Sequence, residues 1–320
     1  MNKLEQLKQI STLVIDTGDI EAVKKYRPVD ATTNPSLILA AIERPEYRPL
    51  MEEAYQYSRQ ARDSKEEQLS LMMDKLFVNV GAEILKLIPG RVSTEIDARL
   101  SFDVEGSIKK ALSLIALYEK MGIPKERVLI KLASTWEGGI AAERLEKMGI
   151  HCNMTLLFSL PQAIHCAKSH ATLVSPFVGR ILDWYKKQEN AKDYNPEEDP
   201  GVYSVTLIYH YFKKYGYKTQ IMGASFRNKE EILELAGCDL LTISPKFLEE
   251  LQQETGEVVR KLDAIQSKQM DIKEIHLDEK TFRLLLNEDA MATEKLAEGI
   301  RNFAKDAQKL EQVLRTNFKY

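Results

Sequence analysis

The sequence alternates short runs of apolar, β-branched residues with longer amphipathic segments, and this alternation repeats about eight times. Most of the runs lack the alternating polarity of strands that have one solvent-facing side. Such runs are typical of parallel strands covered by helices on both faces. The runs are residues 13–17, 31–34, 92–96, 128–133, 153–158, 172–177, 220–225 and 240–245.

The segments between the runs predict helices. Ile108, Leu112 and Ile115 share one apolar stripe at helical spacing. Asn228, followed three residues later by Glu231, resembles a capping box at a helix start. Strand followed by helix, repeated about eight times with short turns, favours a (β/α)8 barrel within the α/β class. A doubly wound sheet is the competing fold, but such sheets usually have fewer strands.

Three regions depart from this even spacing. Between Pro35 and Pro89 there is room for more than one helix before the third strand. Residues 184–200 are polar and turn-rich, which predicts a loop inserted between the sixth and seventh strands. An apolar stripe over residues 296–314 predicts a long terminal helix. Because the sequence has no linker-like composition, we expect residues 1–320 to form a single barrel domain with additional N- and C-terminal helices.

Composition and charge exclude several classes of function. The 320 residues carry 45 Lys and Arg against 48 Asp and Glu, so no basic excess favours nucleic acid or an anionic membrane. No apolar stretch is long enough for a membrane span, and the polar N-terminus has no signal-peptide core. Cys152, Cys166 and Cys238 lack paired spacing and the five histidines lack metal-ligand spacing. We therefore expect a cytoplasmic protein without disulfides or a metal site.

Lys131 is the strongest chemical anomaly, because it lies inside the apolar run 128–133. A lysine buried in a strand costs several kcal/mol unless it is paired or neutral. One interpretation is a structural lysine that pairs with a carboxylate of the core. The other is catalytic, because the C-terminal strand ends of a (β/α)8 barrel carry the active site. A neutral lysine amine at that place is a nucleophile that forms a Schiff base with a carbonyl substrate.

Polar residues occupy similar places near the ends of other runs. Because these ends meet at one mouth of a barrel, we expect the polar side chains to surround the Lys131 amine. Asp16 and Glu95 would supply acid–base partners, or each would form a structural ion pair with a barrel lysine. The remaining polar residues of this set are Asn34, Asn153, Thr155, Ser175 and Ser225.

Arg180 and Arg227 predict a phosphate site. Each arginine lies just past a predicted strand end, with Ser175 or Ser225 nearby. The planar guanidinium group suits bidentate recognition of phosphate oxygens. Surface arginines paired with acidic loops are the alternative. The sequence contains no P-loop and no GxGxxG motif that would predict a nucleotide.

Two segments resemble the signatures of the transaldolase family. Residues 30–38 (DATTNPSLI) resemble the first signature, and residues 128–138 (VLIKLASTWEG) resemble the second, which surrounds a Schiff-base lysine. The likeness continues through residues 152–158, 175–185 and 222–228, and it covers nearly the whole chain. The sequence is therefore similar to bacterial transaldolases of the classical length.

This resemblance implies a class I aldolase-type (β/α)8 barrel of the pentose phosphate pathway. The implied reaction transfers a dihydroxyacetone unit from sedoheptulose 7-phosphate to glyceraldehyde 3-phosphate, giving erythrose 4-phosphate and fructose 6-phosphate. Phosphorylated sugars are the implied partners, and no metal or organic cofactor is implied. Members of the family are expected to be homodimers.

The resemblance also implies roles for individual residues. Lys131 would be the Schiff-base lysine and Asp16 the acid–base carboxylate, while Glu95 and Thr155 would hold a catalytic water. The residues implied to bind the hydroxyl groups of the dihydroxyacetone unit are Asn34, Asn153 and Ser175. Those implied to bind phosphate are Arg180, Ser225 and Arg227.

Two places bear on the choice among related activities. Phe177 stands near the position where related fructose-6-phosphate aldolases have a tyrosine, which favours transfer over aldol cleavage. Gly138 and Gly139 depart from the family pattern of one glycine followed by a large apolar residue, at the start of the fourth helix. The alternatives are a lyase that releases dihydroxyacetone and a sugar-phosphate-binding barrel without turnover. A binding protein, however, has no use for a costly buried lysine.

Overall fold

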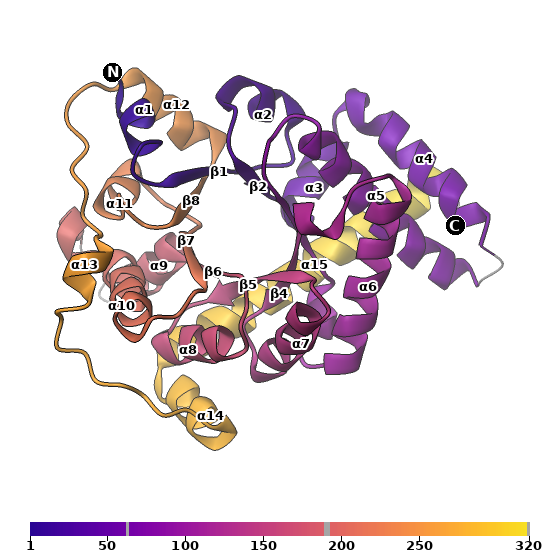
Figure 1. Cartoon of the computed structure of the whole chain (residues 1–320). Helices are drawn as coiled ribbons and strands as arrows, with labels where there is room; N and C mark the ends of the chain where they lie inside the picture. The colour runs from indigo at the N-terminus through magenta and orange to yellow at the C-terminus, as the bar shows by residue number, and fades with distance from the viewer. Residues whose placement is uncertain (62–63, 189–192, 319–320) are drawn as a thin grey trace.

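The computed structural model describes residues 1–61, 64–188 and 193–318. Eight parallel strands close into a barrel in the order of the chain, which confirms the predicted (β/α)8 fold (Figure 1). The strands are β1 (Thr12–Asp16), β2 (Asp30–Thr32), β3 (Val92–Glu95), β4 (Val128–Ala133), β5 (His151–Leu157), β6 (Leu173–Pro176), β7 (Gln220–Gly223) and β8 (Leu240–Ile243).

Helices surround the barrel and include three between β2 and β3, as the spacing predicted. None of the described helices is both long and apolar enough to cross a membrane. The helices are α1 (Lys3–Leu7), α2 (Ile20–Tyr26), α3 (Pro35–Ile42), α4 (Arg48–Arg59), α5 (Lys65–Leu85), α6 (Val104–Lys120), α7 (Trp136–Lys147), α8 (Leu160–Lys168), α9 (Val178–Gln188), α10 (Pro200–Tyr215), α11 (Lys229–Glu234), α12 (Pro245–Gln253), α13 (Ala264–Ser267), α14 (Glu279–Glu288) and α15 (Ala290–Phe318). Short 3₁₀ helices are η1 (Pro45–Tyr47), η2 (Ala98–Leu100), η3 (Lys125–Arg127) and η4 (Pro196–Glu198).

An apolar cluster inside the barrel explains where the polar strand residues point. This cluster comprises Val14, Leu129, Leu173, Met222 and Leu240. Side chains two residues apart on a strand share a face. Two residues after Val14, Leu129 and Leu173, toward the C-terminal ends of β1, β4 and β6, the same inner face therefore carries Asp16, Lys131 and Ser175. The sequence thus builds an apolar layer first and a polar layer directly above it.

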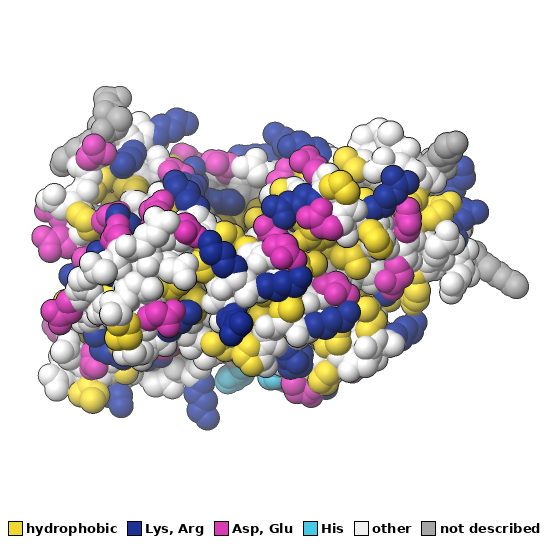
Figure 2. Space-filling model, turned by 90° about the horizontal axis from the view of Figure 1, so that it is seen from above, with side chains coloured by type: hydrophobic (Ala, Val, Ile, Leu, Met, Phe, Trp, Pro, Cys, Tyr) yellow, Lys and Arg dark blue, Asp and Glu magenta, His cyan; other side chains and the backbone are white. Residues whose placement is uncertain are grey.

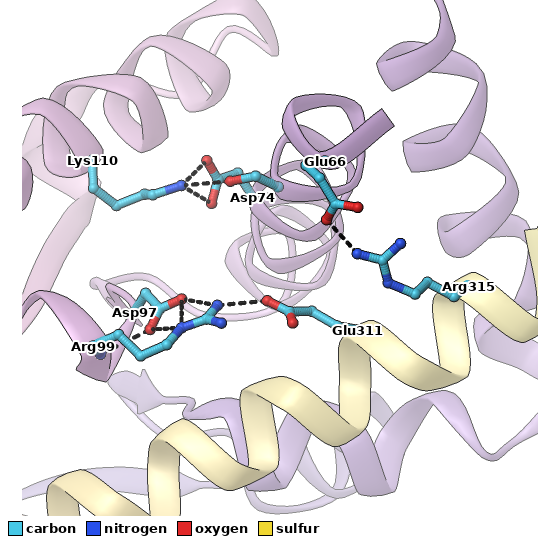
Figure 3. A network of polar contacts seen from close by, with 8 residues as sticks. Glu66, Asp74, Asp97, Arg99, Lys110, Glu311 and Arg315 are labelled. Carbon is cyan, nitrogen blue, oxygen red and sulfur yellow. Dashed lines mark hydrogen bonds and ion pairs between the residues drawn. The ribbon is translucent and has the colours of Figure 1, made fainter. Parts of the chain in front are cut away.

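Helix α15 crosses from α14 to α3 and α5, and it confirms the predicted terminal helix (Figure 1). Ion pairs attach its C-terminal half to the neighbouring elements. Figure 3 shows Arg99, held by Asp97, reaching Glu311 of α15, while Arg315 contacts Glu66 of α5. The same helix carries Phe303, which is 2% exposed, to the mouth of the barrel.

The two consecutive glycines at the start of α7 have a steric reason. The helix begins at Trp136, and its N-cap residue Thr135 accepts a hydrogen bond from the Gly138 amide. A Cβ atom at Gly138 would lie 2.0 Å from the carbonyl oxygen of Ala133. A Cβ atom at Gly139 would lie 2.1 Å from the His165 ring. The departure from the family pattern therefore leaves the helix start intact and allows α7 to pack closely.

Three local expectations were wrong. Asn34 was expected at the end of a strand, but β2 ends at Thr32 and Asn34 is the N-cap of α3, because its side chain accepts from the Leu37 amide. Ser225 was also expected within a strand, but β7 ends at Gly223. The polar residues 184–188 were expected in a loop, yet they form the last turns of α9, whose polar side faces solvent. Part of the predicted insertion, residues 189–192, lies outside the described residues.

Candidate active site

A cavity of about 40 Å³ opens at the C-terminal end of the barrel. Its wall combines ionisable groups, hydroxyl groups and two aromatic rings. The lining residues are Asp16, Thr32, Asn34, Lys131, Ser175, Phe177, Arg180, Met222, Ala224, Ser225, Thr242 and Phe303. Seven of the residues predicted from the sequence therefore meet in one place, although they come from five separate segments of the chain.

Lys131 stands at the centre of this arrangement and is 4% exposed. Its register places it between Glu95 of β3 and Asn153 of β5. The Lys131 Nζ lies 3.3 Å from Glu95 Oε2 and donates to the Thr33 carbonyl oxygen at 3.4 Å. These long contacts hold the amine in position while leaving it directed at the cavity.

Two carboxyl groups near Lys131 have perturbed acidity. Burial raises the pKa of Glu95, and the positive charge of Lys131 opposes this shift. Burial also raises the pKa of Asp16, with Lys131 and a hydrogen bond from Thr32 acting against it. The Thr32 hydroxyl lies 2.7 Å from Asp16 Oδ1. Raised carboxyl pKa values close to a buried amine are characteristic of groups that exchange protons during catalysis.

Three other predicted residues lie deeper than the cavity wall. Asn153 is fully buried, donates to the Ser93 hydroxyl at 3.0 Å and accepts a short hydrogen bond from Ser175. Thr155 is also fully buried, and its hydroxyl has no hydrogen-bond partner within the described part of the chain. Glu95 does not line the 40 Å³ cavity but lies against the amine that does. Glu95 is thus connected to the cavity through Lys131, and Asn153 through Ser175.

Arg180 lies at the rim of the cavity between two aromatic rings. Its guanidinium carbon is 4.8 Å from the centre of the Phe177 ring and 5.4 Å from that of Phe303. Burial, followed by the nearby charge of Arg227, lowers the pKa of Arg180. A cation held by ring faces keeps its hydrogen-bond donors for an anion.

Arg227 differs from Arg180, because it does not line the cavity. Its Nε and Nη2 atoms donate to the Asp183 carboxylate at 2.7–3.1 Å, and both side chains are about two-fifths exposed. Its backbone and Cγ lie against Gly179, where a Cβ atom would come within 2.5 Å. Ser225, two residues earlier, does line the cavity and has a left-handed φ of 60°. Such strained backbone in a non-glycine residue is concentrated at functional sites.

The sequence analysis missed five residues of the cavity wall, namely Thr32, Met222, Ala224, Thr242 and Phe303. Thr32 bridges Asp16 and Thr242, with 2.7 Å between each pair of oxygens. Both threonines lie within the predicted strand runs 31–34 and 240–245, which contain other polar residues as well. Threonine is so common in strands that the residue type alone carries little information. Phe303 was missed because it reaches the mouth from α15, far along the chain.

A second cavity, of about 160 Å³, is lined by Glu95 together with parts of α5, α6 and α15. Figure 3 shows that its charged side chains pair with one another, as Lys110 does with Asp74 and Arg99 with Asp97. No cluster of potential metal ligands occurs among the described residues. The cavity with Lys131 is therefore the candidate active site.

Comparison with known proteins shows which family the chain belongs to. A family model described as transaldolase/fructose-6-phosphate aldolase matches residues 13–314. The chain belongs to the transaldolase/fructose-6-phosphate aldolase family. The match spans all eight strands, so membership of the family extends over the entire barrel.

Curated relatives share the transaldolase name over nearly their full length. The transaldolase of Protochlamydia amoebophila (strain UWE25) is 76% identical over 318 residues, which are 99% of this chain and 98% of that protein. The Homo sapiens transaldolase is 60% identical over 312 residues, covering 97% and 93%. A probable transaldolase of Drosophila melanogaster is 59% identical over 320 residues, covering 100% and 97%. The resemblance seen in the sequence is confirmed, and the chain is a transferase enzyme of the transaldolase family.

Proposed function

We propose that this barrel transfers a dihydroxyacetone unit from sedoheptulose 7-phosphate to glyceraldehyde 3-phosphate through a Schiff base on Lys131. One observation carries the proposal. A buried lysine amine lies 3.3 Å from a carboxylate and lines a polar cavity whose wall also contains Asp16 and Arg180. Nucleophile, base and anion-binding group are thus within one site, as acyl or aldol-type covalent catalysis requires.

The first half of the reaction uses Lys131 and Glu95. Glu95, whose pKa is raised by burial, accepts the proton that makes the Lys131 amine neutral. The amine adds to the C2 carbonyl of the ketose and forms a carbinolamine. Glu95 then returns a proton to the departing hydroxyl through a water that the buried Thr155 hydroxyl holds, which releases water and leaves an iminium ion. The iminium is the electron sink that cleavage of the carbon chain needs.

The second half uses Asp16. Its carboxylate takes the proton of the C4 hydroxyl, the C3–C4 bond breaks, and the electron pair moves into the iminium to form an enamine. Erythrose 4-phosphate leaves, while the three-carbon enamine stays bound to Lys131. When glyceraldehyde 3-phosphate enters, the enamine carbon attacks its aldehyde and Asp16 returns the proton to the new hydroxyl. Hydrolysis of the iminium then releases fructose 6-phosphate and restores the amine.

The remaining predicted residues would position the substrate. Asn34 and Ser175 line the cavity and would bind hydroxyl groups of the dihydroxyacetone unit, with Asn153 fixing Ser175 from below. Arg180 and Ser225 would bind the phosphate at the rim. Arg227 would join them from its place beside Asp183.

The acceptor dependence of the reaction tests transfer against its alternatives. Enzyme with fructose 6-phosphate and erythrose 4-phosphate should produce sedoheptulose 7-phosphate, and omission of the acceptor should leave free dihydroxyacetone at trace levels. Free dihydroxyacetone formed at the rate of transfer would identify a lyase instead, a result that Phe177 disfavours. Binding of fructose 6-phosphate without product in either assay would identify a non-catalytic barrel.

A cytoplasmic homodimer completes the proposal. The buried, unpaired thiols of Cys152, Cys166 and Cys238 suit a reducing compartment. The dimer is carried over from the family resemblance. Light scattering of the purified chain tests it, with twice the 36.6 kDa chain mass expected.

A further inference from the structure

Two buried carboxyl groups lie where α10 and α11 pack together, and one of them contacts the segment of residues 225–227, here named the phosphate arm. Asp199, the N-cap of α10, is 3% exposed, and Glu231 of α11 is 1% exposed. Asp199 and Glu231 interact electrostatically, and the negative charge of Asp199 raises the pKa of Glu231. The Glu231 Oε1 atom is buried and has no hydrogen-bond partner within the described part of the chain. A proton on this oxygen would satisfy it and remove the repulsion between two buried carboxylates, because like charges that lie close together favour the protonated form.

The remaining contacts of both carboxyl groups are with backbone amides. Asp199 Oδ1 accepts from the amides of Gly201 and Val202, at 2.7 and 3.2 Å, and so caps α10 as an ionised group does best. Glu231 Oε2 accepts from the amide of Arg227 at 2.6 Å. The proton therefore belongs on Glu231, which donates it to Asp199 while holding the backbone of the phosphate arm.

Close backbone packing connects this pair to the active site. The amide of Gly179 donates to the Ser225 carbonyl oxygen at 2.9 Å, and a Cβ atom at Gly179 would collide with Arg227. A Cβ atom at Gly201 would lie 2.1 Å from the carbonyl oxygen of Val178. The backbone therefore packs closely at three places, which are the start of α9, the start of α10 and the phosphate arm. This packing leaves no room for an added side-chain atom at Gly179 or Gly201. The electrostatic interaction between Asp199 and Glu231 closes this ring of contacts.

We propose that Glu231 is a positioning residue for phosphate recognition, which holds the phosphate arm in its binding conformation through a proton that it shares with Asp199. The inference rests on the proposed function, because it assumes that the arm binds the phosphate of a sugar substrate. Neither carboxyl group contacts the reacting atoms, so the effect is on substrate affinity and not on the chemical steps.

The charges around the pair determine how it responds to pH. Burial raises the pKa of Glu231 to about 8, and the negative charge of Asp199 adds to this shift. The amides of Arg227 and Asn228 act in the opposite direction on Glu231, and Lys186 of α9 favours the ionised form of Asp199. Toward α12, Lys229 is already paired with Glu254. When Glu231 ionises in alkaline solution, the two carboxylates repel each other and the Arg227 amide loses its fixed acceptor.

Two substitutions remove the repulsion in different ways. In Glu231→Gln, the amide group donates to Asp199 and its oxygen still accepts from Arg227, so the protonated arrangement is kept at every pH. In Asp199→Asn, the side-chain oxygen still caps α10 and the amide donates to an ionised Glu231. The matched control is Glu230→Gln, which removes an exposed carboxylate one residue away on the same helix.

The experiment measures KM for fructose 6-phosphate and for unphosphorylated fructose as donors from pH 6.5 to 9.5. In the wild type and in Glu230→Gln, KM for fructose 6-phosphate should rise by about tenfold above pH 8, as expected when a charge-assisted contact to phosphate is weakened. KM for fructose should stay constant, and kcat should change equally in all variants. Both Glu231→Gln and Asp199→Asn should keep the low KM of neutral pH throughout. The same rise in these two variants as in the wild type would overturn the proposal.

Thermal unfolding provides a second measurement that does not depend on activity. The pKa of Glu231 is raised in the folded state, so its proton stabilises the fold below the unfolded value near 4.5, and this stabilisation is lost as the pH rises toward 8. The Tm of Glu231→Gln should therefore increase relative to the wild type between pH 5 and pH 8. If the Tm shift is present but transfer activity is absent, the proposed function is refuted and the shared proton is not. If the Tm difference between Glu231→Gln and the wild type is the same at every pH, the shared proton is refuted.

Discussion

Charged groups at the two ends of the barrel differ in how completely they are paired. At the N-terminal end, Arg91 donates to both oxygens of Asp30 and to Gln220, and Lys213 contacts both oxygens of Asp239 within 2.8 Å. At the C-terminal mouth, Lys131 has only contacts of 3.3 and 3.4 Å.

Arg180 at that mouth rests on aromatic rings. The difference separates two uses of charge. Fully paired groups at the N-terminal end stabilise strand ends, whereas incompletely paired groups at the C-terminal end are kept for the substrate. This division is the general pattern of (β/α)8 enzymes.

Replacing the nucleophile should have the largest effect on activity. Lys131→Met should reduce kcat by about 10⁴-fold or more, because no other group can carry the covalent intermediate. The fold should be retained, since Glu95 can bind a proton and become neutral when its cation is removed. Transfer assays and thermal unfolding check both statements. Residual activity above one per cent of wild type would contradict the assigned role.

The opposite outcome is expected at the other end of the barrel. Arg91→Met should lower the free energy of unfolding by about 3 kcal/mol, because it leaves the Asp30 carboxylate buried beside an apolar chain. Its kcat should remain near that of the wild type. Chemical denaturation measures the first value and steady-state kinetics the second. If Arg91→Met reduced kcat strongly while stability stayed constant, the contrast between the two ends would be wrong.

The two arginines of the phosphate site should contribute unequally. Arg180→Ala should raise KM for fructose 6-phosphate by about 30- to 100-fold, because it removes a buried cation whose donors face the cavity. Arg227→Ala should raise KM by only about five- to tenfold, because its guanidinium is partly exposed and already bound to Asp183.

Unphosphorylated fructose is the control donor for both arginine variants. Its KM should be almost unchanged. Equal losses with phosphorylated and unphosphorylated donors would show that the arginines are structural. A larger effect of Arg227→Ala than of Arg180→Ala would reverse the proposed ranking.

The smallest expected effect is a shift in the pH dependence of kcat/KM. Burial raises the pKa of Asp16, and the hydrogen bond from Thr32 partly offsets this shift. Thr32→Val removes that bond, so the pKa should rise further and the carboxylate should be lost at higher pH. The acidic limb of the kcat/KM profile should therefore move upward by up to about one pH unit. Thr12→Val, at the other end of β1, is the control and should leave the profile unchanged. If Thr32→Val moved the acidic limb to lower pH, the assignment of this limb to Asp16 would be contradicted.

The sequence predicted the barrel and its catalytic centre because both leave local signals. Apolar runs without polar alternation indicated strands buried on two faces, and Lys131 was conspicuous as a charge inside one of them. The sequence prediction ended helix α9 too early, because the polar exposed face of a helix resembles a loop in composition. The residues 184–188 show that amphipathic helix ends near an insertion are poorly marked.

Contacts between distant segments could not be predicted. Arg227 was placed with Arg180 by analogy of position, but nothing local indicated that Asp183, 44 residues earlier, would bind its guanidinium. Phe303 enters the mouth from α15, and Glu231 meets Asp199 only because α10 and α11 are brought together by the barrel. Such pairings depend on the closed topology, which a local pattern does not encode.

The central claim is a covalent intermediate on Lys131, and borohydride trapping tests it most directly. The protein is incubated with fructose 6-phosphate, reduced with borohydride, digested and analysed by peptide mass spectrometry. A reduced three-carbon adduct on Lys131, absent without substrate and absent in Lys131→Met, is the predicted result. An adduct on another lysine, or no adduct while the enzyme turns over, would contradict the mechanism.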